Sequence, residues 1–304
     1  MRKVSVILPT HNRADLLQSA VHSVLNQTFR DFELIIIDDH STDHTTNVIK
    51  RFNDKRINYL QNTGKNGPSI ARNFGMKNAT GKYIAFLDDD DEWFPDKLEK
   101  QIRILDLAKP DVCGIYSRPL IIERKTGNVI LNETKVKKLR GSLLSQLMIK
   151  NPIQTSTLII RKVCIDKIGM FDENMRYMED RDLFIRLAMN WDFEYIDEPL
   201  TKKFHHGYEH LSENLSGQTI GREVILRRYS DLLKTKKRSW SLMHICLGAQ
   251  YCQMGKMKQG RKNLLKGIVI YPFNKISFFH LFASFWGKNN YQRIRHAYKS
   301  SAIE

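Results

Sequence analysis

Short β-branched segments alternate with helical patterns through the first part of the chain. Residues 4–8 and 32–37 are apolar except at Ser5 and Glu33, which is typical of strands buried on both faces of a sheet. Apolar residues at helical spacing follow Asn12, which we expect to cap that helix. Strand–helix alternation with short connections predicts a parallel sheet with right-handed crossovers, and therefore an α/β fold.

The same pattern assigns the remaining segments. We expect strands at 57–60 and 82–87, followed after a change of pattern near residue 110 by strands at 112–116, 120–123, 128–131 and 156–161. Helices are expected at 43–52, 69–78, 142–149 and 181–190. Residues 202–218 are polar and rich in histidine, so they are expected to form a loop, and the chain is helical and basic from Arg222 onward.

Polar clusters follow three of the expected strands. Thr10 follows the first strand, Asp38 and Asp39 follow the second, and four consecutive aspartates at 88–91 follow the strand at 82–87. Ligands of open α/β sheets bind beyond the carboxyl ends of the strands. Three clusters that are distant in sequence are therefore expected to meet on one rim of the sheet.

The aspartate run carries the clearest chemical signal. Four adjacent carboxylates repel one another, so folding alone does not favour them. A divalent cation bound to a diphosphate offsets that repulsion, and oxygen ligands favour Mg²⁺ or Mn²⁺. A solvated acidic loop is the alternative, but an apolar strand leads directly into the run. Trp93, just beyond it, either stacks on a sugar or belongs to the core.

The positive charge of the chain is concentrated near its end. The net charge is +16, and residues 222–304 contain 17 Lys or Arg residues against 3 Asp or Glu residues. A solubilising tail is one interpretation, and attraction to an anionic membrane surface or a polyanionic substrate is the one that we favour. The sequence lacks zinc-finger spacing and the aromatic pattern of RNA-recognition motifs, so we expect no nucleic-acid partner.

Small residues recur within this basic tail. Gly248, Gly260 and Gly267 follow the spacing of a tetratricopeptide helix pair, in which glycines let two helices pack closely. An ordinary helical hairpin explains the spacing equally well. The aromatic stretch 278–286 is suited to a membrane interface. No segment approaches the roughly 20 apolar residues of a membrane span, and the four cysteines form no CxxC pair. We therefore expect a soluble or peripheral protein in a reducing compartment.

Four pieces of the sequence, in their order and spacing, resemble family 2 of the glycosyltransferases: VSVILPTHNR, ELIIIDDHSTD, NGPSIARNFGMKNATGKYIAFLDDDDEWFPDKLE and IGMFDENMRYMEDRDLFIRLAMN. The resemblance implies a GT-A fold, in which helices flank a Rossmann-like, mostly parallel sheet, here with a C-terminal α-helical appendage. It also implies an inverting, hexosyltransferase-type enzyme that uses Mn²⁺ or Mg²⁺. The expected donor is a UDP-sugar, and the expected acceptor is a hydroxyl of a glycan or lipid-linked molecule.

The resemblance divides the chain into three expected parts. Residues 1–110 would form the nucleotide-sugar-binding half of the GT-A domain, 111–220 the acceptor-binding half, and 221–304 the basic helical region. We expect a cytoplasmic protein, peripheral at the inner face of the plasma membrane, that builds a cell-envelope polysaccharide or a similar glycan.

Donor-site roles follow from the matching positions. Thr10 would lie against the nucleotide base or ribose, Asp39 would accept a hydrogen bond from the base, and Arg72 would lie near the nucleotide. In the family's DxD motif, Asp88 would contact the ribose. Asp89, at the middle position, adds a charge to the donor site without an assigned role.

Metal-site and catalytic roles follow in the same way. Asp90 would hold the metal, and a histidine after the base helix often completes the metal shell. His206 is the preferred histidine, with His205 and His210 as alternatives. Asp180 matches the candidate general base, and Glu179 would orient that base or the acceptor. Both carboxylates would also favour the N-terminus of a helix, which is the structural alternative.

Two other functions remain compatible with these residues. One is a catalytically inactive scaffold of the same fold that binds a glycan or nucleotide, and the other is a nucleotidyltransferase. The joint presence of Asp39, Asp90 and Asp180 disfavours the scaffold. Release of pyrophosphate in place of a nucleoside diphosphate would identify the nucleotidyltransferase.

Overall fold

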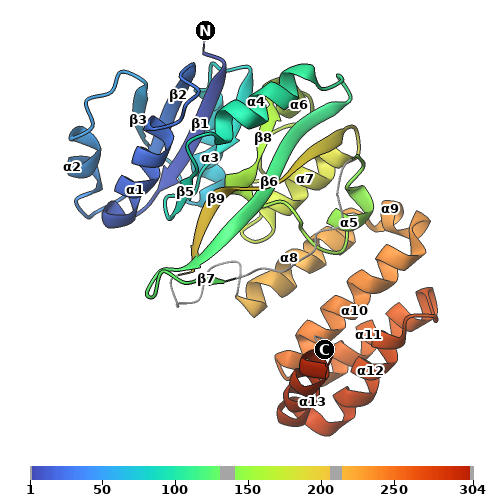
Figure 1. The fold of residues 1–304 in the computed structure, drawn as a ribbon. Helices are drawn as coiled ribbons and strands as arrows, with labels where there is room; N and C mark the ends of the chain where they lie inside the picture. Colours follow the sequence, from blue (N-terminus) through green and yellow to red (C-terminus); the bar gives the residue numbers. More distant parts are fainter. Residues whose placement is uncertain (1, 131–140, 206–213, 302–304) are drawn as a thin grey trace. The chain divides into compact units, whose positions relative to one another are not determined.

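The computed structural model of the protein describes residues 2–130, 141–205 and 214–301. The chain separates into two compact units (Figure 1). Unit 1 consists of Met1–Leu144, Pro152–Asn174 and Glu179–Tyr208, and unit 2 consists of Ser145–Asn151, Met175–Met178 and Glu209–Glu304. The division into functional parts at residues 110 and 220 stays a prediction.

Unit 1 is built on a nine-stranded mixed sheet. Its strands are β1 (Val4–Thr10), β2 (Phe32–Asp38), β3 (Ile57–Gln61), β4 (Tyr83–Phe86), β5 (Asp91–Trp93), β6 (Val112–Glu123), β7 (Val129–Ile130), β8 (Ile159–Arg161) and β9 (Asp192–His205). The strand order is β3-β2-β1-β4-β8-β6-β9-β5, with β7 paired to β6. The pairs β1–β2, β1–β4, β2–β3 and β6–β9 are parallel. The α/β, GT-A-like fold class is thereby confirmed.

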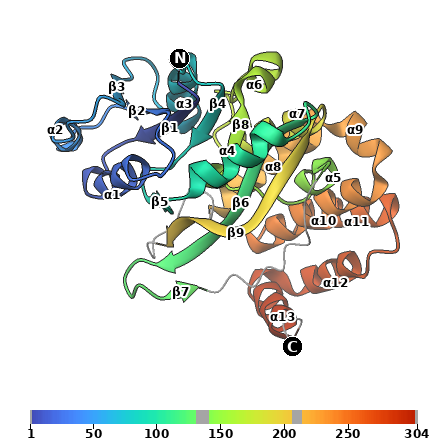
Figure 2. The same ribbon diagram turned by 45° about the horizontal axis from the view of Figure 1, so that its top comes forward.

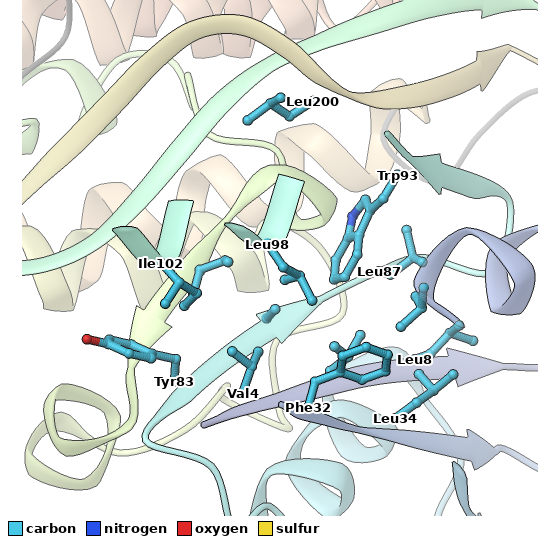
Figure 3. Packing of buried hydrophobic residues seen from close by; sticks show 14 of the residues in the cluster. Val4, Leu8, Phe32, Leu34, Tyr83, Leu87, Trp93, Leu98, Ile102 and Leu200 are labelled. Carbon is cyan, nitrogen blue, oxygen red and sulfur yellow. The ribbon is translucent and has the colours of Figure 1, made fainter. Parts of the chain in front are cut away.

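Helices cover both faces of this sheet. They are α1 (Ala14–Leu25), α2 (Thr45–Lys50), α3 (Pro68–Lys77), α4 (Lys97–Leu107), the short η1 (Thr155–Thr157), α6 (Lys162–Ile168) and α7 (Glu179–Ala188). Leu98 and Ile102 of α4 point toward the strand that carries Val4 (Figure 3). On the opposite face, α3 lies so close that a Cβ at Gly75 would come within 2.8 Å of Ile7 Cγ2.

Trp93 belongs to this core and does not offer a surface to a sugar. Its side chain is almost fully buried and points into the apolar cluster (Figure 3). The indole Nε1 donates a hydrogen bond to the carbonyl oxygen of Ser156 at 2.8 Å. The ammonium of Lys97 lies 4.1 Å from the ring centroid. Of the two interpretations of Trp93, the structure therefore supports core packing.

Two sequence predictions about unit 1 are wrong for identifiable reasons. Residues 202–205 belong to β9 and not to a loop, because pairing with β6 and β5 overrides their polarity. Asn12 does not cap α1. Its Oδ1 instead accepts the backbone N–H groups of Thr42 and Asp43, at 2.7 and 3.3 Å. This bond ties the loop after β1 to the loop after β2.

All secondary-structure elements among the described residues of unit 2 are helices. Unit 2 contains α8 (Leu215–Arg228), α9 (Ser230–Thr235), α10 (Lys237–Gln253), α11 (Met257–Ile270), α12 (Lys275–Ala283), η3 (Ser284–Trp286) and α13 (Gly287–Ser301), and the short α5 (Leu144–Leu147) begins at the last residue of a unit 1 segment. The expected C-terminal helical region is confirmed, although it begins at Leu215, before Arg222. Among the described residues, no helix is both long and apolar enough to cross a membrane.

Helices α10 and α11 pack side by side through glycines (Figures 1 and 2). A Cβ at Gly248 would lie 2.7 Å from Leu264 Cγ and 2.9 Å from the carbonyl oxygen of Gly260. A Cβ at Gly267 would lie 2.8 Å from Ile245 Cγ1. Real Cβ atoms do not approach that closely, so these glycines set the spacing of the two helices.

Replacing Gly267 with Val is expected to destabilise unit 2 by about 1–3 kcal/mol, because overpacking forces the helices apart. Thermal unfolding followed by circular dichroism measures the loss. Gln259→Val is the matched control, since Gln259 is exposed on the same helix. Equal destabilisation by both substitutions would mean that β-branching, and not the close contact, is responsible.

Candidate active site

Loops at the carboxyl ends of β1, β2 and β4 meet on one rim of unit 1. Thr10, at the end of β1, donates its hydroxyl to Asp89 Oδ2 at 2.8 Å. The backbone N–H of Asp39, after β2, bonds the carbonyl oxygen of Thr10 at 2.9 Å. Asn12 and His40 in these loops have positive φ angles of 51° and 67°. Non-glycine residues seldom adopt such angles, and they often do so at functional sites.

Asp39 is held in one orientation by two short hydrogen bonds. Its Oδ1 accepts from Asn62 Nδ2 and its Oδ2 accepts from the backbone N–H of Gly67, both at 2.7 Å. Gly67 has φ of 143° and precedes α3, so the carboxylate lies at the N-terminus of that helix. The negative charge is favoured there by the helix dipole. Recognition of a nucleotide base by Asp39, and of base or ribose by Thr10, stays a prediction.

Three of the four consecutive aspartates form a compact oxygen cluster. Asp88, Asp90 and Asp91 each offer a carboxylate oxygen, and these oxygens all lie within 4.8 Å of one another. A set of hard oxygen donors at this spacing fits Mg²⁺ or Mn²⁺. Burial, together with the negative charges of Asp88 and Asp90, raises the pKa of Asp91 to about 7 against the opposing effect of Lys203. Asp91 was not among the candidate ligands from the sequence.

Asp89 faces away from this cluster and joins two loops. Besides the hydroxyl of Thr10, its carboxylate accepts a bond from Arg13 Nη1 at 2.9 Å. The same nitrogen donates to Asp90 Oδ2 at 2.8 Å. Burial raises the pKa of Asp89 to about 6, even though Arg13 opposes the shift. The extra aspartate therefore has a structural partner, and Arg13 is a site residue that sequence reasoning missed, although it ends the piece VSVILPTHNR.

Arg72 connects the aspartate cluster to the start of α7. Its Nη2 donates to Asp88 Oδ1 at 2.7 Å, and its Nη1 lies 3.4 Å from Glu179 Oε1. The guanidinium is buried, and its Nε has no hydrogen-bond partner within the described structure. Burial by itself raises the pKa of Asp88, but Arg72 and Lys203 outweigh it and hold that pKa below its ordinary value.

Lys203 is a second cation that the sequence did not indicate as a site residue. It lies opposite Asp91 in the antiparallel pairing of β5 with β9. Burial by itself lowers the pKa of Lys203, but the negative charges of Asp91, Asp88, Asp90 and Asp180 outweigh it and raise that pKa. An ammonium that faces all of these carboxylates is an internal counter-charge of the site. Its side chain reaches the site because residues 202–205 form a strand.

Glu179 and Asp180 begin α7 and form a half-buried acidic pair. The residue before them, Met178, has a positive φ of 60°. Burial and the charge of Asp180 raise the pKa of Glu179 to about 7, against the opposing effect of Arg72. Burial also raises the pKa of Asp180, although the N–H of Arg181 and the charge of Arg72 oppose it. A buried carboxyl group with a raised pKa is suited to proton transfer near neutral pH.

The candidate histidines are described only in part. His205 is the last residue of β9, and its carbonyl oxygen accepts the backbone N–H of Arg124 at 3.0 Å. His206 and His210 lie outside the described residues. The assignment of His206 to a metal shell stays a prediction.

The raised pKa of Glu179 predicts a dependence of stability on pH. The ordinary value is 4.5 and the folded value about 7, so between these values the folded chain binds more protons than the unfolded chain. The free energy of unfolding therefore falls as the pH rises from about 4.5 to about 7. Glu179→Gln removes this penalty and is expected to stabilise the metal-free protein at pH 8 by roughly 1–3 kcal/mol, with little effect at pH 5.

Urea denaturation of both proteins at the two pH values measures this difference. Asp15→Asn is the control, because the side chain of Asp15 is 91% exposed. A gain from Glu179→Gln that is the same at pH 5 and pH 8 would contradict the prediction, since it would have a cause other than ionisation.

Comparison with known proteins places these residues in a family context. Residues 5–166 match the family model described as "Glycosyl transferase family 2". An uncharacterized glycosyltransferase of Rickettsia felis is 36% identical over 203 residues, which are 66% of this chain and 32% of that protein. The chain thus spans about a third of the length of that relative.

Two further comparisons extend the likeness. The Escherichia coli protein WfgD, a UDP-Glc:alpha-D-GlcNAc-diphosphoundecaprenol beta-1,3-glucosyltransferase, is 42% identical over 123 residues, which are 40% of this chain and 48% of WfgD. The crystal structure of S. aureus TarS 1–349 in complex with UDP-GlcNAc has a TM-score of 0.71 at 18% identity and covers 98% of this chain and 92% of that one. At that identity, the structural likeness concerns the fold.

Proposed function

Because the chain belongs to glycosyl transferase family 2, we propose that it transfers a sugar from a nucleoside-diphosphate sugar to a hydroxyl group, with inversion at the anomeric carbon. The observation that carries this proposal is the arrangement of two acidic groups. The Asp88–Asp90–Asp91 cluster, suited to a divalent cation, is joined through Arg72 to the half-buried pair Glu179 and Asp180.

The charges of the site support a diphosphate leaving group. Six carboxylates gather here among the described residues (Asp88, Asp89, Asp90, Asp91, Glu179 and Asp180), and four cationic side chains act on them (Arg13, Arg72, Arg181 and Lys203). A diphosphate would add further negative charge. Mg²⁺ or Mn²⁺ held by Asp88, Asp90 and Asp91 would offset the charge that develops on the departing nucleoside diphosphate.

Asp180 is the proposed general base. It takes the proton of the acceptor hydroxyl as that oxygen forms a bond to the anomeric carbon, and the bond between that carbon and the diphosphate oxygen breaks. One base on the face opposite the leaving group gives a single displacement, and hence inversion. Glu179, held by Arg72, orients the base or the acceptor.

The proposed donor is a UDP-sugar, bound by Thr10, Asp39, Arg72, Asp88 and Asp89, with Asp90 and His206 at the metal. The proposed acceptor is a glycan or a lipid-linked molecule of cell-envelope polysaccharide synthesis. The similarity to WfgD, a UDP-glucose-dependent glucosyltransferase with a diphosphoundecaprenol acceptor, supports both choices. The hydrogen bonds from Asn62 and Gly67 hold the carboxylate of Asp39 in one orientation, which supports its proposed role in binding the donor.

A panel of nucleotide-sugars tests the proposed function. Purified protein is incubated with each donor and Mn²⁺ or Mg²⁺, and release of free nucleoside diphosphate is followed with and without a lipid-linked acceptor. Metal-dependent release from one donor is the expected result and names the sugar. Metal-dependent nucleotide binding without release would leave only the acceptor to be found. Neither binding nor release from any donor would favour a scaffold, and release of pyrophosphate would favour a nucleotidyltransferase.

A further inference from the structure

Unit 2 exposes large apolar side chains on α11, on α12 and between them. The exposed fraction is 83% for Val269, 81% for Phe273, 68% for Phe282 and 65% for Phe285. The rings of Phe282 and Trp286 meet edge to face, with centroids 4.3 Å apart. Scattered exposed apolar residues are ordinary, but a gathering of aromatic side chains indicates a surface that another body covers.

These side chains form a stripe on each helix. On α12, Lys275, Phe278 and Phe282 follow helical spacing and are all exposed. On α11, the exposed residues Lys258, Lys262, Leu265 and Val269 also follow helical spacing. Residues at such spacing share one side of a helix. Since α11 packs against α12, the two stripes belong to neighbouring helices (Figure 2).

The charge of this region is of one sign. Residues 256–303 contain ten Lys or Arg residues and no Asp or Glu. Pairing of two copies of this surface would bring cations against cations, which is unfavourable. The surface is therefore complementary to an anionic partner.

We propose that this surface docks the protein on an anionic lipid bilayer. The docking face is defined by Val269, Phe273, Phe278 and Phe282, with Lys258 and Lys262 beside them. Aliphatic and aromatic side chains that share a stripe with lysines are typical of helices that lie in a membrane interface. The apolar groups enter the boundary between headgroups and acyl chains, and the ammonium groups bind the anionic headgroups. Nucleic acid would bind through bases stacked on the aromatic rings, and this would not explain why the aliphatic side chain of Val269 is exposed beside them.

The docking face deepens the proposed function, because a lipid-linked acceptor is confined to a membrane surface. The role of the docking face in bringing the protein to its acceptor rests on the proposed function. Lipid binding itself requires neither donor nor acceptor, so the two proposals fail independently.

Co-sedimentation of the full chain with vesicles tests the proposal. Vesicles of phosphatidylcholine alone are compared with vesicles that also contain phosphatidylglycerol. We expect the protein to bind the anionic vesicles, and added salt to weaken that binding. Phe273→Ser combined with Phe282→Ser is expected to weaken it by about tenfold or more, because two exposed aromatic groups no longer enter the interface. Leu107→Ser combined with Val163→Ser is the matched control, since both residues are exposed apolar side chains of unit 1.

A second pair of variants separates charge from apolar contact. Lys258→Gln combined with Lys262→Gln is expected to weaken binding to anionic vesicles by about 25-fold, because each basic residue near such a surface contributes about fivefold. Circular dichroism of each variant checks that its fold is intact, as expected for exposed positions.

Three results would overturn the docking face. The first is a native chain that does not bind anionic vesicles. The second is a loss of vesicle binding in the unit 1 control that equals the loss in the Phe variant. The third is self-association without lipid that the Phe variant abolishes, because this would assign the face to a second copy of the chain. Release of nucleoside diphosphate from the donor panel is measured on the native chain and on the same variants. A native chain that releases nucleoside diphosphate but does not bind anionic vesicles rejects the docking face alone, and a native chain that binds the vesicles but releases nothing from any donor counts against the proposed function alone.

Discussion

Asp180→Asn is expected to lower the rate of sugar transfer by about 10³-fold, because general base catalysis typically contributes between about 10² and 10⁴. The substitution keeps the size of the side chain and removes its ability to take a proton. Donor affinity is expected to change by less than about threefold, since the base contacts the acceptor and not the nucleotide. The loss therefore falls on kcat and not on binding.

Single-turnover transfer and nucleotide titration separate these two quantities. Asp15→Asn is the control for the substitution itself, because the side chain of Asp15 is 91% exposed and is not one of the clustered carboxylates. The pH profile adds an independent readout. Burial raises the pKa of Asp180, so the native rate should fall on the acid side at a pH above the ordinary titration of an aspartate, and the variant should lose this limb. A variant that retains a tenth or more of the native rate would assign the base to another group.

The first strands of the sheet could be predicted from the sequence for a local reason. β1 and β2 are apolar at most of their positions and on both faces, so their burial can be predicted without knowledge of their neighbours. β9 could not be predicted in this way. Its residues 202–205 are polar, and they are extended because β6 and β5, which are distant in sequence, provide hydrogen-bonding partners. The single strand β6 was expected as two segments, at 112–116 and 120–123, and its pairing with β9 shifts register between them, at Arg118 and Pro119.

The candidate site likewise has a part that local sequence predicts and a part that depends on contacts between distant segments. The aspartate run can be recognised in the sequence, because four adjacent carboxylates repel one another and folding alone does not favour them. Which three of them cluster, and which one turns to Thr10 and Arg13, depends on loop geometry that no local pattern contains. Lys203 was missed for the reason that β9 was missed, since its position opposite Asp91 exists only when the strand pairs.

Asp90→Asn is expected to weaken the binding of Mn²⁺ by about 100-fold or more and to lower transfer by about 10³-fold. The carboxylate of Asp90 supplies one of the three clustered oxygens. Its replacement by an amide removes one negatively charged ligand from the cation, and a weakly held cation stabilises the leaving diphosphate less. Asp89→Asn is the matched control, because the neighbouring aspartate has the same side chain but bonds Thr10 and Arg13 outside the cluster. Its effect on Mn²⁺ affinity is expected to stay below about tenfold.

Lys203→Gln is expected to change Mn²⁺ affinity in the opposite direction to Asp90→Asn. The ammonium of Lys203 faces Asp88, Asp90 and Asp91, so it competes with a divalent cation for them. Its removal is expected to tighten Mn²⁺ binding in the absence of nucleotide, whereas Asp90→Asn weakens it. Calorimetric titration of Mn²⁺ into the native protein and each variant measures the direction of both changes in affinity. Equal weakening by Asp89→Asn and Asp90→Asn would mean that the whole run, and not a three-carboxylate cluster, attracts the cation. An unchanged affinity in Lys203→Gln would show that this lysine neutralises carboxylates that the metal does not use.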